Sequence, residues 1–269
     1  MTLTIQTLGR DRFDEAVALC EDTFEAVYPR NEIRRSFGCV DPDLSVGLFR
    51  GGVMVGTYLI STVTVDRCIH LRLHPEFRCL FRRTALRGDA IALRPDERGR
   101  GTGRLLRAIL PEIARTNRID YVWGSALHEL NNLDDWLRRR VLFAQTPGGN
   151  HTVEPVAADL KWKLMPFASP ECLARWALQM NSPRQIQGEI VYQAGPIPRL
   201  WCLSDTEAYP IHAGRNIEQI LIEEAGQTAR FTCQVEDGTF KVQGKVQLLG
   251  FAKSANNVGD DASSVAMAI

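Results

Sequence analysis

The residues best suited to chemistry in this chain lie at positions 91–106, which read IALRPDERGRGTGRLL. The pattern predicts a strand, a proline turn, a glycine-rich loop and the first turn of a helix. Glycines at positions 99, 101 and 103 let backbone N–H groups approach a ligand without a Cβ in the way. The helix start adds unpaired N–H donors and the positive end of a dipole. Together they indicate an anion site, most naturally for a pyrophosphate.

Two other phosphate-binding loops are excluded by spacing. A Walker loop requires GxxxxGK[ST], and the chain contains no such string. A dinucleotide fingerprint requires GxGxxG, whereas the glycines here follow one another at every second position. Ser/His/Asp and GxSxG patterns are also absent from the sequence, so hydrolase chemistry has no support.

The loop and its flanks resemble the GNAT acyltransferase superfamily. Residues 98–103, RGRGTG, match the superfamily signature [RQ]-x-x-G-x-[GA]. Upstream, residues 91–95 (IALRP) are similar to the strand-ending Leu-Ala-Val-x-Pro, and downstream the match extends into Leu105 and Leu106. The resemblance covers residues 1–165 and implies an acyltransferase that uses acyl-CoA, with acetyl-CoA as the first expectation.

The resemblance also implies where CoA is held. Main-chain groups of Ile91 and Leu93 would pair with the pantetheine arm like an added strand. A gap between the strands at 84–93 and 119–126 would receive it, and a backbone N–H there would polarise the thioester carbonyl. The pyrophosphate would contact the loop residues Arg98, Gly99, Arg100, Gly101, Thr102, Gly103 and Arg104.

Asp89 is the candidate general base. In this superfamily the base often projects from the fourth strand, two or four positions before the Leu-Ala-Val segment, and those positions hold Asp89 and Arg87. A base at neutral pH requires burial to raise the carboxyl pKa, whereas Arg87 or Arg94 would lower it. The alternative is that Asp89 forms a structural ion pair with one of these arginines.

A second signature of the superfamily, N-x-x-A-x-x-L-Y-x-x-x-G-F, is only partly present. Aligned on Asn131, it places Arg138 where a Tyr commonly protonates the leaving thiolate. Arginine cannot be that acid, because its pKa exceeds ~12. Arg138 would instead stabilise a thiolate or bind a CoA phosphate, or belong to an exposed Arg triple. The thiolate then leaves without a protein acid, or the acid comes from Tyr121, Ser125 or His128.

The predicted fold class is α/β: a mixed, mostly antiparallel sheet flanked by helices, followed by a smaller C-terminal α+β domain. Residues 1–165 are expected in the order β-α-β-β-β-α-β-α-β, with an N-cap at Asp11, a helix over 131–143 and a last strand over 158–165. Residues 166–253 form the α+β domain of unknown role, with a hairpin around 236–238. The small, polar segment 254–269 is expected to be poorly ordered.

The charge is zero overall but uneven. Lys plus Arg and Asp plus Glu each number 32. Residues 67–118 carry thirteen Arg against five acids, a net of +8, and residues 11–66 carry five Arg against ten acids, a net of −5. A local basic block favours one anionic ligand over a role on nucleic acid or on a membrane.

Other features point to a reduced, cytoplasmic protein without a metal. The seven Cys are scattered without a CxxC pair, and no signal peptide or membrane span is recognised. His70 and His74 have metal-like spacing only on a helix, yet their segment alternates like a strand. No metal site is expected.

The function that we expect from these features is transfer of an acyl group, acetyl first, from CoA to a primary amine of a small molecule in a ternary complex. The acceptor would meet residues 20–40 and 68–83. Acids there suit a cationic amine, and arginines suit a carboxylate-bearing amine or an acyl carrier protein; they are Glu21, Asp22, Glu25, and Arg72, Arg78, Arg82 and Arg83. One alternative is a long-chain N-acyl amino acid or acyl-lactone synthase, and another is a non-catalytic CoA-binding module. A homodimer is a further expectation for the C-terminal domain.

Overall fold

One continuous sheet runs through the described residues of the computed structural model. Those residues are 2–26, 28–64, 75–126, 142–146, 149–178, 183–194, 199–205, 207–236 and 239–251. The strand order is β11-β12-β10-β9-β8-β1-β2-β3-β4-β5-β7-β6. The strands are β1 (Leu3–Thr7), β2 (Val46–Arg50), β3 (Val53–Thr64), β4 (Thr84–Leu93), β5 (Tyr121–Ala126), β6 (Leu142–Thr146), β7 (Gly149–Pro155), β8 (Pro183–Gln193), β9 (Arg199–Leu203), β10 (Ala208–His212), β11 (Gln227–Glu236) and β12 (Thr239–Phe251).

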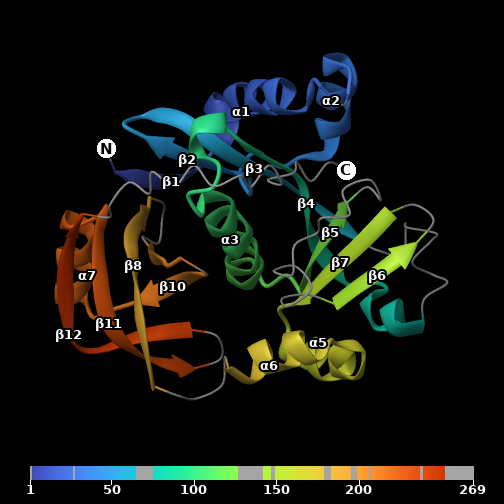
Figure 1. The fold of residues 1–269 in the computed structure, drawn as a ribbon. Helices are drawn as coiled ribbons and strands as arrows, with labels where there is room; N and C mark the ends of the chain where they lie inside the picture. Colours follow the sequence, from blue (N-terminus) through green and yellow to red (C-terminus); the bar gives the residue numbers. More distant parts are fainter. Residues whose placement is uncertain are drawn as a thin grey trace.

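Helices cover both faces of the central strands (Figure 1). On one face α1 (Gly9–Phe24) and α2 (Arg30–Ser36) pack on β3 and β4 through a cluster that includes Phe24, Ile33 and Leu59. On the other face α3 (Thr102–Thr116) packs through Leu105, Ile109 and its neighbours against the second side of the same strands. The two faces of β3 and β4 are therefore both buried.

The predicted mixed, mostly antiparallel α/β fold is confirmed. Among the described strand pairs, β4–β5, β1–β8 and β10–β12 run parallel and the others antiparallel. From β1 to β5 the element order is the one that the resemblance to the GNAT superfamily implies, with the additional short helix α2. Helix α3 continues through Pro111, although a proline at that position lacks one backbone hydrogen bond. None of the helices in the described ranges is both long enough and apolar enough to span a bilayer.

The C-terminal strands close into a barrel. Strands β8, β9, β10, β12 and β11 follow one another, and β11 pairs back onto β8. Helix α7 (Arg215–Glu223) packs on this barrel, and the hairpin expected around 236–238 joins β11 to β12. The barrel contacts the N-terminal part of the chain, because Trp201 and Leu203 of β9 pack in the same core as α3. The division at residues 165 and 166 stays a prediction.

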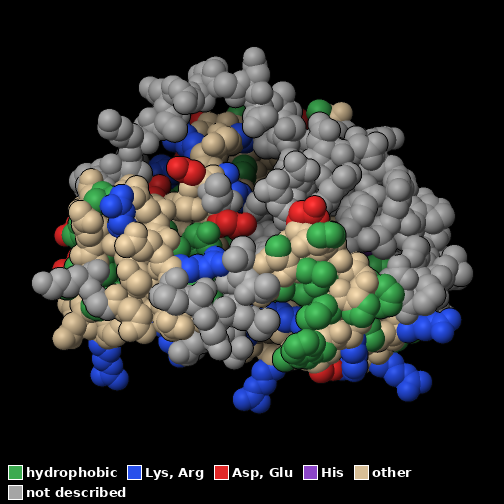
Figure 2. Space-filling view, turned by 60° about the horizontal axis from the view of Figure 1, so that its bottom comes forward, with side chains coloured by type: hydrophobic (Ala, Val, Ile, Leu, Met, Phe, Trp, Pro, Cys, Tyr) green, Lys and Arg blue, Asp and Glu red, His purple; other side chains and the backbone are tan. Residues whose placement is uncertain are grey.

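The strand expected over residues 158–165 is wrong, because these residues form helix α5 (Ala158–Leu164). The alternation of apolar residues suggested a strand, but the helix buries Leu160 and Leu164 on one side and leaves Trp162 67% exposed. Leu160 and Leu164 pack against Phe77 and Tyr121, so tertiary contacts decide the conformation. Figure 2 shows hydrophobic side chains gathered on the face that carries α5.

The N-cap expected at Asp11 is also wrong, because α1 already begins at Gly9. The backbone N–H groups of Leu8 and Gly9 donate to the carbonyls of Ser45 and Pro42, at 2.9 Å and 3.1 Å. A side-chain cap is therefore not needed there. By contrast, α6 (Pro170–Leu178) has a side-chain cap, since the Ser169 Oγ accepts from the Cys172 N–H at 3.1 Å.

Two expected segments lie outside the described residues. One is the tail at 254–269. The other is the helix at 131–143, except for its last two positions, which begin β6.

Candidate functional site

A split between β4 and β5 forms the centre of the site. The two strands pair in parallel from Ala85 opposite Tyr121 to Gly88 opposite Gly124, and the pairing ends there. Strand β4 continues to Leu93, and its last five residues have no partner in β5. The gap expected between these strands thus opens at Gly88, and about 16 Å of β4 edge borders it at ~3.3 Å per residue.

The peptide groups of Ile91 and Leu93 face this gap. The Arg94 N–H donates to the Val55 carbonyl at 2.9 Å. Since the hydrogen bonds of the β3–β4 ladder use every second residue of β4, Ala92 also bonds to β3. In an antiparallel pair the residues between them direct their N–H and C=O groups to the opposite side. Ile91 and Leu93 therefore present donors and acceptors to the split, where β5 does not reach them.

The glycine loop lies directly after this strand edge. Gly99 and Gly101 have φ of 74° and 81°, a conformation that favours glycine, and Gly101 is the N-cap of α3. Within the described chain, no backbone acceptor is recorded for the N–H groups of residues 99–103. Five consecutive N–H groups at a helix N-terminus form a site for an anionic group.

A largely buried ion pair fixes the residues just before the glycine loop. Glu97 is buried, and its two carboxylate oxygens accept from the Arg50 guanidinium at 2.8 Å and 3.1 Å. The Glu97 carbonyl also accepts from the Thr102 hydroxyl at 3.2 Å. These bonds tie the loop to the end of β2, so that its N–H groups are held in place before a ligand binds.

The three loop arginines differ in what they contact. Arg98 and Arg100 are exposed, and neither forms an ion pair with a residue of the described ranges. Arg104 instead donates from Nη2 to the Ser204 carbonyl at 3.2 Å, and its backbone N–H donates to Gly101 at 2.9 Å. Arg98 and Arg100 are therefore the side chains available to an anion, whereas Arg104 contacts the barrel.

Asp89 occupies a β-bulge at the start of the split. Leu59 pairs with Ala90 and Ile60 with Gly88, so Asp89 is the extra residue of β4. Its carboxylate accepts from Arg87 Nε at 2.6 Å and also contacts Arg87 Nη2. Ser61, the other neighbour, lies two positions after Leu59, so Asp89 is on the face covered by α1 and α2.

One carboxylate oxygen of Asp89 does not take part in the ion pair with Arg87. Oδ2 is buried and, like the Ser61 hydroxyl, makes no hydrogen bond of standard geometry with the described residues. Burial raises the pKa of Asp89, and the nearby Ser61 hydroxyl and the Arg87 charge oppose this rise. The structure is therefore compatible with both hypotheses for Asp89, the ion pair and the general base. Asp89 is ion-paired with Arg87, and its Oδ2 remains able to accept a proton.

Tyr58 is a residue of this site that the sequence analysis did not single out. It lies on β3 on the face of α3, and its ring covers Gly88. A Cβ built on Gly88 would lie 2.1 Å from the Tyr58 hydroxyl oxygen. Burial is the main cause of a pKa for Tyr58 well above that of an ordinary phenol. No sequence signal marks this contact, because it joins two strands across the sheet.

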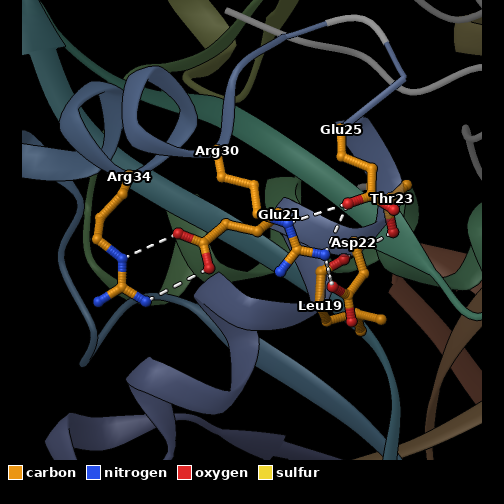
Figure 3. Close-up of polar contacts among 7 residues, drawn as sticks. All are labelled: Leu19, Glu21, Asp22, Thr23, Glu25, Arg30 and Arg34. Carbon is orange, nitrogen blue, oxygen red and sulfur yellow. Dashed lines mark hydrogen bonds and ion pairs between the residues drawn. The ribbon is translucent and has the colours of Figure 1, made fainter.

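The acids expected to attract a cationic amine are paired with arginines (Figure 3). Arg30 of α2 contacts Asp22 and Glu25, both at 2.7 Å, and Arg34 contacts Glu21 at 2.9 Å. The hydrogen bond from Arg34 is the main cause of a lowered pKa for Glu21. The expected acidic surface is therefore largely neutralised, which corrects the simple charge argument.

The arginines expected on the acceptor side also differ from one another. Arg83 is paired with Asp120 and Asp159, at 3.1 Å and 2.5 Å. Arg78 and Arg82 are exposed without an ion pair in the described ranges, at the end of β4 farthest from the glycine loop.

Several expected site residues lie outside the described residues: Asn131, Arg138, His128, Arg72, His70 and His74. Tyr121, weighed as an acid, is buried in the cluster with Phe77 and Leu160 on the α5 side. Within the described ranges, no group of three or more His, Cys, Asp or Glu side chains is placed to hold a metal ion.

Comparison with known proteins finds similarity at the level of structure. No protein-family model matches the chain, and no curated protein matches it. FeeM, an N-acyl amino acid synthase from uncultured soil microbes, is 17% identical with a TM-score of 0.44, covering 61% of this chain and 96% of that one. PaiA N-acetyltransferase from Thermoplasma acidophilum, in complex with coenzyme A, is 12% identical with a TM-score of 0.40, covering 58% and 99%. Arylalkylamine N-acetyltransferase 2 from Aedes aegypti is 10% identical with a TM-score of 0.38, covering 46% and 75%. Since these values are low, the residues and geometry of this chain must carry the functional conclusion.

Proposed function

We propose that this chain is an N-acyltransferase of the GNAT superfamily that transfers an acyl group, acetyl first, from CoA to a primary amine of a small molecule. One observation carries the proposal. The split between β4 and β5 opens beside peptide groups of Ile91 and Leu93 that β5 does not reach, and it leads to a glycine loop whose N–H groups at residues 99–103 have no backbone acceptor of standard geometry in the described ranges. An extended donor with an anionic end fits this combination.

The loop would hold the pyrophosphate of the donor. The N–H groups of residues 99–103 supply hydrogen bonds that need no rearrangement. The guanidinium groups of Arg98 and Arg100 add charge at the mouth. Space at the loop is limited, since a Cβ at Gly101 would lie 2.7 Å from Arg104 Nη2.

The strand edge would hold the pantetheine arm and orient the thioester. Ile91 and Leu93 offer the hydrogen bonds of a β-strand to an extended chain. A backbone N–H at this edge that reaches the carbonyl oxygen stabilises the negative charge that develops when the amine attacks. The reaction is direct, with both substrates bound together.

Asp89 would accept the proton of the attacking amine. Its Oδ2 is buried beside the split without a hydrogen bond of standard geometry in the described residues, and burial raises the pKa of Asp89 above that of an exposed aspartate. The amine nitrogen forms the new amide bond while the carbon–sulfur bond breaks, and the proton passes to Asp89 or to a water between them. The thiolate leaves and takes a proton from solvent, since Arg138 replaces the usual acid Tyr.

The acceptor would approach from the face that α1 and α2 cover, because Asp89 lies on that face. The ion pairs of Glu21, Asp22 and Glu25 leave little net negative charge there. We therefore expect an amine recognised mainly by shape and hydrogen bonds, and not by its charge alone.

The deciding experiment measures thiol release from acetyl-CoA with a panel of primary amines that includes amino acids and arylalkylamines. The expected result is turnover with at least one amine and none without an acceptor. Parallel assays with octanoyl-CoA and an acylated carrier protein separate acetyl transfer from long-chain synthesis. CoA binding without turnover on any amine would leave a binding module, and the enzyme proposal would be wrong.

Charge reversal at the loop tests the placement of CoA. The variant Arg98→Glu/Arg100→Glu should weaken CoA binding at least tenfold by calorimetry, because charge-assisted phosphate contacts contribute about 1.5–3 kcal/mol each. Arg118→Glu is the matched control, since Arg118 is exposed near the opposite end of α3. Equal affinity in the double variant and the wild type would contradict this placement.

A further inference from the structure

The closed end of the split consists of two glycines. Gly88 and Gly124 are the last paired residues of β4 and β5, so no side chain projects from either strand there. Beyond them the ladder is intact as far as Ala85 and Tyr121. An extended ligand that enters from the Leu93 end and follows the split must therefore stop at the two glycines or turn out of the sheet.

On the α3 face that exit is closed by Tyr58. Its ring atoms Cε2 and Cζ would lie 2.5 Å and 2.6 Å from a Cβ on Gly88, so the phenol occupies the volume that a side chain there would fill. Behind the ring lie apolar core residues that include Ile60, Leu86 and Ile109, while the charge of Arg107 acts on the hydroxyl. Removal of the ring would connect the split to an apolar space.

Charged and bulky groups border the opposite face of the sheet at this point. Asp89 and Arg87 form their ion pair there, and Trp123 lies opposite Arg87 in the ladder. An alkyl chain gains nothing by displacing an ion pair that is largely buried. At Gly88 the way out on this face meets the ion pair, whereas the way that Tyr58 closes leads to the apolar residues of the α3 core.

We propose that Tyr58 limits the length of the acyl group, so that the wild-type chain transfers short acyl groups. This inference rests on the proposed function, because it places the acyl group in the split between β4 and β5. From Ile91 to Gly88 the strand rises about 10 Å, and the thioester and its acyl tail share this length before the tail reaches the end of the split. A longer tail meets the phenol.

The test compares kcat/KM for acetyl-, butyryl-, hexanoyl- and octanoyl-CoA at a fixed amine. Wild type should favour the short donors. In Tyr58→Ala the ratio of hexanoyl to acetyl should rise at least tenfold, because each newly buried methylene adds about fourfold. Tyr58→Phe, which retains the ring, should keep the wild-type profile. Tyr58→Leu serves as a second ring deletion if the alanine variant does not fold.

The matched control is Val55→Ala. Val55 is a buried residue of the same strand and the same core cluster, but it lies opposite Arg94, at the far end of the split from Gly88. This variant removes core volume away from Gly88, so its acyl-length profile should stay short. An unchanged profile in both ring deletions, or the same shift in Val55→Ala, would overturn the inference.

A binding measurement separates this failure from failure of the proposed function. Calorimetry with CoA, S-ethyl-CoA and S-hexyl-CoA needs no turnover. If all three bind wild type and Tyr58→Ala with equal preference, the acyl-length inference alone is wrong. If none binds, the proposed function and the inference are both wrong. A wild-type protein that prefers octanoyl-CoA would also contradict the role of Tyr58.

Discussion

Asp89 illustrates how one residue is tuned by its neighbours. Burial raises its pKa, whereas the Ser61 hydroxyl and the Arg87 charge lower it. The bulge turns the residue toward Ser61 and Arg87 while β4 remains paired with β3 on either side. A carboxyl in this position is kept more basic than an exposed aspartate, yet it is held in one orientation.

The pH dependence of kcat/KM tests this tuning. A base must be deprotonated, so its raised pKa should place the acidic limb above the ~3.9 of an ordinary Asp. Ser61→Ala removes a group that lowers the pKa, so the limb should move to higher pH. Asp89→Asn should lower kcat at least a hundredfold with CoA affinity retained.

The control for this prediction is Ser36→Ala, a serine whose hydroxyl bonds only to the Ile33 carbonyl in the described structure. Its pH profile should match wild type. If Ser61→Ala moves the limb to lower pH, or leaves it in place, Ser61 does not position Asp89 as described.

At the scale of elements, the packing of β3 on β4 depends on the missing side chain of Gly88. Gly88→Ala would put a Cβ 2.1 Å from the Tyr58 hydroxyl and should destabilise the fold by about 1–3 kcal/mol. Thermal unfolding should show a lower Tm. The double variant Gly88→Ala/Tyr58→Leu should lose less stability than the sum of the single variants, because the clash is removed.

Gly38→Ala is the control for that measurement. Gly38 has no neighbour within 4 Å of a built Cβ, so its Tm should stay close to that of wild type. Additive losses in the Gly88 and Tyr58 variants would show that the ring does not limit the space over Gly88.

At the scale of the whole molecule, the barrel supports the glycine loop. Leu203 Cδ1 lies 3.4 Å from the Cβ position of Gly101, and the Ser204 carbonyl accepts from Arg104. Residues about a hundred positions away in sequence thus hold the start of α3. The C-terminal part therefore contributes to the geometry of the loop, whatever further role it has.

Arg104→Ala distinguishes support of the loop from direct contact with phosphate. We expect the free energy of unfolding to fall by about 1 kcal/mol, as for a half-buried hydrogen bond, and the Tm to fall with it. The loss of CoA affinity should stay below tenfold. Thermal unfolding and calorimetry on the same sample give both values. An affinity loss as large as in Arg98→Glu/Arg100→Glu with an unchanged Tm would place Arg104 on the phosphate.

The sequence by itself determined the features that depend on neighbours along the chain. The strand, turn, glycine loop and helix of residues 84–116 follow from local backbone preferences, because glycine permits positive φ and a helix start leaves its N–H groups free. The order of strands and helices up to β5 and the position of Asp89 on β4 follow from the same periodicity and from the family resemblance.

Only the tertiary structure decided which distant side chains meet. The pairing of Glu21 with Arg34, the contact of Tyr58 with Gly88 and the bond from Arg104 to Ser204 each join separate elements. Residues 158–164 became a helix because Leu160 and Leu164 pack into a core formed elsewhere in the chain. Such contacts depend on packing in three dimensions, and alternation or spacing in the sequence does not encode them. The loop could therefore be read from the sequence, but the shape and closure of the split beside it could not.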